Sequence, residues 1–371
     1  MKPLIITLIS ILSLTSLHAG SNPNGFSLNK GVNISHWLSQ RGERPREDIQ
    51  TFFTEFDVIM LKQAGFDHLR IPIDEVEFWD DNGKAREDAW AALDRGLTWC
   101  QRHDLNVIVD LHIIRSHYFN VGNDDNKEQG NTLFEDPREQ EKFVQLWDEI
   151  SDRIGHFPVD RVAYEFMNEA VGDDPEDWNR LLQKVYGFMR EKEPTRTFVL
   201  GSFQFQSIDT LSDLWVPEGD RNLVISIHTY DPFVVTHYKA GWTPFREYQG
   251  PINYPGLPFP EEIDASAYSA EIQRWIEDNQ KPYSYEAAVA RLKPVAEFMA
   301  KHNLPMYCGE WGCYLAVPRE MRLDYYRDWI RAFETLNIAQ AIWDYKGGFR
   351  IVNDETREID HELIDILMAE Y

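Results

Sequence analysis

Two glutamates of this chain have the surroundings expected of a catalytic pair. Glu169 closes the segment Ala-Tyr-Glu-Phe-Met-Asn-Glu, and Glu310 lies in Met-Tyr-Cys-Gly-Glu-Trp-Gly, so each follows a short apolar run. Hydrolysis of a glycosidic bond needs two carboxyl groups: one protonates the leaving oxygen, and the other attacks the sugar or activates water. The sequence therefore predicts a sugar-cleaving site, provided that the fold brings these distant residues together.

The elements that would position the two glutamates alternate along the chain. Apolar runs typical of buried strands occupy residues 31–34, 68–71, 106–111, 161–166, 197–200, 223–227, 305–308 and 339–343. Helical patterns lie at 49–64, 89–103, 138–154, 175–191, 285–302, 319–336 and 360–369, and residues 207–214 hold at most a short helix. Eight buried strands that alternate with helices predict a (β/α)8 TIM barrel, an α/β fold, in a single domain. A dinucleotide-binding fold would need a glycine-rich turn after the first strand, and none is present.

Six of the predicted strands end in polar or aromatic residues. In a parallel barrel these ends lie on one face, where active sites form. Any one of these residues alone could be a structural ion pair or part of the core, but together they favour an active site. In chain order they are Arg70, His112, Asn168, Glu169, His228, Tyr230, Glu310 and Trp343.

Two of the predicted loops on this face are long, at residues 112–136 and 229–281. Long loops at the carboxyl ends of barrel strands build the site. Within the second loop, residues 230–259 contain eight aromatic residues interleaved with prolines. This composition suits neither a helix nor a strand, and we expect a rigid wall that stacks on the apolar faces of sugars.

With these motifs in order, the chain resembles glycoside hydrolase family 5, the cellulase-type barrels with catalytic glutamates after strands four and seven. The resemblance covers residues 26–371 and rests on His-Leu-Arg-Ile-Pro, Asp-Leu-His, Phe-Met-Asn-Glu, Ser-Ile-His-Thr-Tyr and Gly-Glu-Trp-Gly, followed by Trp343. It implies that Glu169 is the acid/base and that Glu310 is the nucleophile of a retaining mechanism.

The resemblance also implies roles for the residues around the pair. Arg70 and Tyr230 would keep Glu310 ionised by positive charge and a donated hydrogen bond. The remaining roles are a bond from Asn168 to the sugar 2-hydroxyl, orientation of the sugar and the acid/base by His112 and His228, and stacking on Trp343. No cofactor or metal is expected.

Three outer residues are weaker candidates for substrate binding. His36 and Trp37 follow the first strand and would line the next sugar subsite, with core packing an equal alternative. Lys346 would bond a sugar hydroxyl, unless it is a solvated surface lysine. The cluster Asp124-Asp125-Asn126 has the ligand types for calcium but not the spacing of a known calcium loop, and a solvated loop tip is the simpler interpretation.

Composition indicates which substrates, disulfides and cellular location to expect. The formal charge is −25, which opposes binding to nucleic acid or to an anionic polysaccharide and favours a neutral substrate. Three cysteines (Cys100, Cys308 and Cys313) provide no disulfide framework, although the last two could form one bridge. Residues 1–19 have one basic residue, a short apolar run and a small terminal residue, which predicts a secretory signal peptide before a catalytic domain at 20–371, and export to the periplasm or the medium.

The interpretation that unites these features is an exported, monomeric, retaining endo-β-1,4-glucanase that acts on a neutral β-linked glucan. Two features of the sequence leave the substrate of the enzyme open. Ile113 follows His112, where many members of the family carry a second His or a Trp, and Gly-Val-Asn-Ile-Ser-His-Trp-Leu resembles the exo-β-1,3-glucanases of the family. The alternatives are therefore a β-mannanase, a xyloglucanase or mixed-linkage glucanase, and an exo-β-1,3-glucanase. A sugar-binding barrel without activity is more remote, since both glutamates are present.

Overall fold

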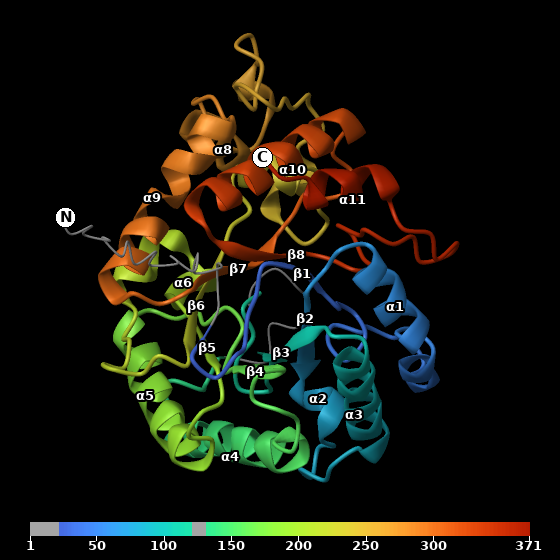
Figure 1. The fold of residues 1–371 in the computed structure, drawn as a ribbon. Coiled ribbons are helices and arrows are strands. Elements are labelled where there is room, and N and C mark those ends of the chain that lie inside the picture. Colours follow the sequence, from blue (N-terminus) through green and yellow to red (C-terminus); the bar gives the residue numbers. More distant parts are fainter. Residues whose placement is uncertain (1–21, 121–130) are drawn as a thin grey trace, which may run out of the picture.

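The computed structural model describes residues 22–120 and 131–371 and contains a closed parallel barrel. Its eight strands follow one another in chain order around the ring, and β8 pairs with β1 to close it (Figure 1). The strands are β1 Lys30–Asn33, β2 His68–Asp74, β3 Asn106–Ile113, β4 Val162–Glu165, β5 Phe198–Gly201, β6 Leu223–His228, β7 Met306–Trp311 and β8 Ala339–Ile342. The predicted (β/α)8 barrel is confirmed.

Helices surround the ring of strands (Figure 1). Those of eight residues or more are α1 Glu55–Gln63, α3 Glu87–Arg102, α4 Pro137–Ile154, α5 Pro175–Lys192, α8 Ala270–Asp278, α9 Tyr285–His302, α10 Arg319–Leu336 and α11 His361–Met368. Helices of a single turn are α2 Glu75–Phe78, α6 Phe203–Gln206 and α7 Phe233–Thr236. Within the described residues, no helix is long and apolar enough to cross a membrane.

Local sequence explains where several helices begin. Asp136 and Asp174 each accept a hydrogen bond from a backbone N–H of the first turn, and each precedes a proline at the first helical position. The helix predicted at 49–64 is wrong in its first part. A 3-10 turn covers Arg46–Gln50, and α1 begins only after Thr54, whose backbone and hydroxyl both bond the Asp57 carboxylate at 2.8 Å.

The loop after β6 contains more structure than its composition indicated. Helix α8 lies in it, together with α7 and two 3-10 turns at Pro244–Glu247 and Ala265–Ala267. Only Ile272 and Ile276 of α8, four residues apart on one face, are buried, so this helix contributes little to the core.

Alternation along the strands separates the barrel interior from the layer beneath the helices. One apolar cluster joins strand residues of the same inward face, including Ile108, Ala163 and Val224, with Phe26 and Leu28. Two residues further along these strands, the same face carries Asp110, Glu165 and Ser226, because side chains alternate with a period of two. The barrel interior is therefore apolar towards the amino ends of the strands and polar towards their carboxyl ends.

The three cysteines, Cys100, Cys308 and Cys313, are buried and free. The bridge that the sequence permitted between the last two is not formed.

Candidate active site

A cavity of about 970 Å³ opens at the carboxyl ends of the barrel strands. Its wall contains six of the residues predicted from the strand ends: His112, Glu169, His228, Tyr230, Glu310 and Trp343. Arg70 and Asn168 are fully buried beneath it. The fold therefore brings together all eight strand-end residues, although they come from six different strands.

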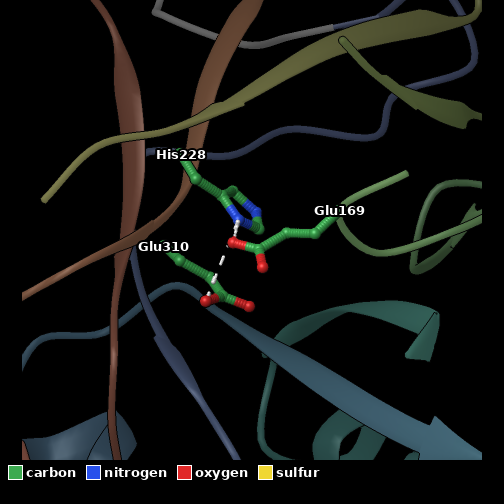
Figure 2. Close-up of side chains that lie close together, drawn as sticks. All are labelled: Glu169, His228 and Glu310. Carbon is green, nitrogen blue, oxygen red and sulfur yellow. Dashed lines mark hydrogen bonds and ion pairs between the residues drawn. The ribbon is translucent and has the colours of Figure 1, made fainter. Parts of the chain in front are cut away.

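Glu169, His228 and Glu310 meet in this cavity. One carboxylate oxygen of each glutamate and a ring nitrogen of His228 all lie within 4.8 Å of one another. Figure 2 shows the imidazole of His228 beside Glu169, with its Nδ1 2.9 Å from Glu169 Oε1 and 3.8 Å from Glu310 Oε2. These groups also form a donor set that a divalent cation could share, so the expectation of a metal-free site stays a prediction.

Glu310 is held by donors on both of its oxygens. Arg70 Nη1 donates to Oε1 at 2.8 Å, and the Tyr230 hydroxyl donates to Oε2 at 3.0 Å. Burial raises the pKa of Glu310, but the charge of Arg70 and the hydrogen bond from Tyr230 act in the opposite direction. The site thus favours the ionised form of Glu310 over that of its neighbour.

Among the residues that the structure describes, no cationic side chain lies in hydrogen-bond contact with Glu169. Burial and the nearby charge of Glu310 raise its pKa well above the ordinary value. Burial and the charge of Arg70 lower the pKa of His228 well below its ordinary value, so the imidazole beside Glu169 is neutral. The environment therefore favours a proton on Glu169 over one on Glu310, which is the division that acid-assisted cleavage needs.

His112 and Trp343 lie parallel to each other in the cavity wall. Their rings stack with centroids 5.6 Å apart and planes 7° apart. Burial lowers the pKa of His112 to about 3, so the ring is neutral. Its Nδ1 donates to Asp110 at 2.7 Å, which leaves Nε2 to accept from the Gln40 amide at 3.1 Å. The wall thus combines an aromatic face with fixed polar edges, as a sugar ring requires.

The sequence of this chain is similar to those of known glycoside hydrolases. The family described as cellulase, glycosyl hydrolase family 5, matches residues 30–348. The chain belongs to that family. Endoglucanase C of Acetivibrio thermocellus is 32% identical over 92% of this chain and 98% of its own length, and cellodextrinase A of Ruminococcus flavefaciens is 29% identical over 80% of each.

Solved structures support the barrel of this family 5 glycoside hydrolase. The endoglucanase Cel5A of the hyperthermophile Thermotoga maritima has a TM-score of 0.72 at 24% identity, over 92% of this chain and 97% of its own. The cellulose synthase subunit Z of Clostridioides difficile has a TM-score of 0.73 at 23% identity, over 92% and 100%. At this level of identity the similarity shows the fold.

Of the three outer candidates, one reaches the cavity of the glycosidase. His36 lies in its wall, with Nδ1 3.0 Å from the Gln40 carbonyl and Nε2 3.5 Å from Asp344. Its φ of 59° turns the chain at this point, which sends the next side chain the other way. The assignment of Trp37 to the site is wrong: this residue is 1% exposed, packs against Phe53 and donates from Nε1 to the Ile49 carbonyl at 2.9 Å.

The assignment of Lys346 is also wrong. Its amine donates to the Phe52 carbonyl at 2.7 Å and lies over the rings of Phe52 and Tyr345, away from the cavity wall. It is buried, so the alternative of a solvated surface lysine is wrong as well. The cluster Asp124-Asp125-Asn126 lies outside the described residues.

The aromatic loop after β6 serves two purposes. Tyr230, Phe233 and Trp242 line the cavity, and their stacking on sugars stays a prediction. The other five aromatic residues of this stretch are buried, namely Tyr238, Phe245, Tyr248, Tyr254 and Phe259. Further rings in the wall that the sequence did not single out are Tyr118, Phe119, Phe205, Trp275, Tyr314 and Phe349.

Three residues that hold Arg70 behind the cavity wall, namely Asn33, Asp110 and Glu165, were not predicted from the sequence. Arg70 is fully buried, and Glu165 accepts from its Nε at 2.7 Å and from its Nη2 at 3.2 Å. Asn33 and Asn168 accept from it too, at 3.0 and 2.8 Å, and Asp110 forms an ion pair with it at 3.0 Å. A sequence signal for Asp110 and Glu165 existed, since each is a charged residue on the inward face of an otherwise apolar strand, where only a partner could hold it.

Proposed function

We propose that this family 5 glycoside hydrolase is a retaining endo-β-1,4-glucanase, with Glu310 as nucleophile and Glu169 as acid/base. The observation that carries the proposal is the approach of their carboxylate oxygens to within 4.8 Å across the cavity. Carboxyl groups lie about 5–5.5 Å apart in retaining enzymes, and about 6.5–9.5 Å apart in inverting enzymes, where a water must fit between them.

The chemistry proceeds in two displacements. Glu310 attacks the anomeric carbon while Glu169 donates its proton to the glycosidic oxygen, so the bond to the leaving sugar breaks and a glycosyl ester forms. Glu169 then takes a proton from a water that attacks the same carbon, and Glu310 is released as the carboxylate. Arg70 and Tyr230 stabilise Glu310 while it is charged. Asn168 Nδ2, buried and without a hydrogen-bond partner among the described residues, would meet the 2-hydroxyl of the sugar.

The substrate assignment rests on relatives and on charge. One relative is named an endoglucanase and another a cellodextrinase, and both names point to β-1,4-linked glucose. The formal charge of −25 supports a neutral glycan. Residues 1–19 support export as a signal peptide, which N-terminal sequencing of the secreted protein would test.

The deciding experiment measures products from carboxymethylcellulose, mannan, xyloglucan and laminarin, with NMR of the first anomer released. We expect internal cleavage of carboxymethylcellulose and a first product of β configuration. A preference for mannan or xyloglucan, or release of glucose from the end of laminarin, would replace the proposed substrate. An α anomer as the first product would overturn the retaining mechanism.

A further inference from the structure

A buried amide lies directly behind the two glutamates. Gln206, at the end of α6, is fully buried and does not line the cavity. Its Oε1 accepts from the backbone N–H of Glu169 at 3.0 Å, and its Nε2 donates to Glu165 Oε1 at 3.2 Å and to the Ser226 hydroxyl at 2.8 Å. Because a backbone N–H can only donate, the amide has one orientation, with oxygen towards Glu169 and nitrogen towards Glu165.

The local backbone and a neighbouring glycine place the Gln206 side chain in this buried position. Gln204, Phe205 and Gln206 have φ values of 50°, 61° and 53°, a left-handed conformation that is unfavourable for residues other than glycine. Gly201 leaves the space that the side chain fills, since a Cβ there would lie 2.5 Å from Gln206 Cδ. Three strained residues and one obligatory glycine thus accompany a single buried amide.

The bonds of Gln206 run towards both glutamates. On one side it fixes the backbone N–H of Glu169, which is itself left-handed, with a φ of 45°. On the other side it bonds Glu165, which holds Arg70 through Nε at 2.7 Å, and Arg70 in turn holds Glu310 at 2.8 Å. These members are all buried, so their hydrogen bonds do not compete with bulk water.

We propose that Gln206 is a positioning residue for the acid/base. It holds the left-handed backbone of Glu169, and thereby aims the Glu169 carboxyl at the leaving oxygen, while it braces Arg70 through Glu165. The inference rests on the proposed roles of Glu169 and Glu310. It predicts that loss of the amide weakens proton donation more than it weakens attack by Glu310.

The test is Gln206→Met, which keeps the length of the side chain and removes its hydrogen bonds. The readout is kcat/KM for aryl β-cellobiosides with dinitrophenol, nitrophenol and phenol as leaving groups, and for cellotetraose. We expect losses on the order of 10- to 100-fold where the leaving group needs a proton, and a change of no more than about twofold for the dinitrophenyl substrate. An equal loss across the series would mean a purely structural role and overturn the proposal.

Ser226→Ala is the matched control, because it removes one partner of the Gln206 amide and leaves the bonds to Glu165 and Glu169. We expect the dependence on leaving group to stay that of the wild type. The same leaving-group effect in both variants would contradict a role that acts through Glu169.

Gln206→Glu gives a second readout if Gln206→Met fails to fold. A protonated carboxyl at position 206 can accept from the Glu169 N–H and donate to Glu165. An ionised carboxyl cannot donate, and it repels the Glu165 carboxylate that holds Arg70. We expect kcat/KM close to the wild type at acid pH and an earlier fall as pH rises. A profile identical to the wild type at every pH would overturn the proposal. A wild-type enzyme that cleaves none of these β-glucosides would instead refute the proposed function.

Discussion

Glu169 after β4 and Glu310 on β7 share one cavity, yet their neighbours differ. Glu310 accepts from a guanidinium and from a phenol, at 2.8 and 3.0 Å. Glu169 lies beside the neutral imidazole of His228, and burial together with the charge of Glu310 raises its pKa well above the ordinary value. The comparison shows how two identical side chains come to differ in their affinity for a proton because of the groups around them.

The two strand ends also aim their carboxylates by different means. Glu310 remains in β7, where the pairing with β6 and β8 shifts register close to it, and such irregularities redirect side chains next to active sites. Glu169 lies beyond the last residue of β4, Glu165, and a left-handed backbone directs it. Strand geometry thus places the proposed nucleophile, whereas a backbone held by hydrogen bonds places the proposed acid/base.

Removal of the proposed nucleophile should have the largest effect. Glu310→Gln keeps the shape of the side chain, so we expect fold and substrate binding to persist while kcat falls on the order of 10⁴-fold or more. Activity against carboxymethylcellulose and binding of cello-oligosaccharide by calorimetry would measure the two properties. Azide should rescue Glu310→Ala and form a glycosyl azide of inverted configuration. An active Glu310→Gln protein, free of deamidation, would refute the assignment.

Removal of the proposed acid/base should have a smaller effect that depends on the substrate. Glu169→Ala should reduce cleavage of poor leaving groups by about 10²- to 10⁴-fold, because these need protonation. Activated aryl glycosides leave without a proton, so the glycosyl-enzyme should accumulate, and azide should speed its breakdown with retained configuration. Equal losses on aryl glycosides and polysaccharide, without an azide response, would place the acid/base elsewhere.

These contrasts indicate which parts of the site a sequence can predict. The strand-end residues were predictable because parallel strands in a barrel bring their carboxyl ends to one face, so position along the strand fixes position in space. The barrel itself was predictable because eight buried runs alternate with helical patterns. Both arguments depend on regular structure.

Away from the strand ends the same approach was less successful. His36 and Trp37 are adjacent, but the left-handed φ of His36 sends one side chain to the cavity and the other to the core. Lys346 is four residues past β8, and the carbonyl that captures its amine belongs to Phe52, far away in sequence. Gln206 depends on three left-handed residues that no composition would indicate. Backbone direction in loops is set by tertiary contacts, which spacing does not encode.

Arg70→Lys should sharpen the comparison between the two glutamates, because it keeps the positive charge and loses the planar, multidentate guanidinium. Arg70 makes hydrogen bonds or ion pairs to Glu310, Glu165, Asp110, Asn33 and Asn168, and a lysine amine has only three donors. We expect kcat/KM to fall on the order of 10²-fold, because Glu310 and Asn168 lose their shared anchor. Kinetics and a melting curve would be measured together, and full activity in Arg70→Lys would show that charge alone suffices.

Tyr230→Phe should have the smallest effect and the most specific one. The Tyr230 hydroxyl donates to Glu310 at 3.0 Å, and this bond lowers the pKa of the carboxyl by favouring its charged form. Without it the pKa of Glu310 rises, so a higher pH is needed to ionise the proposed nucleophile. A hydrogen bond to a charged group contributes about 1.5–3 kcal/mol, and one pKa unit corresponds to about 1.4 kcal/mol.

We therefore expect the acidic limb of the kcat/KM profile of Tyr230→Phe to move upward by about one pH unit. The alkaline limb should shift much less, because it reports the proton on Glu169, which Tyr230 does not contact. An aryl β-cellobioside assayed from acid to neutral pH would separate the two limbs. A shift of the alkaline limb alone would mean that Tyr230 acts on Glu169 and not on Glu310, which would contradict the difference proposed here between the two glutamates.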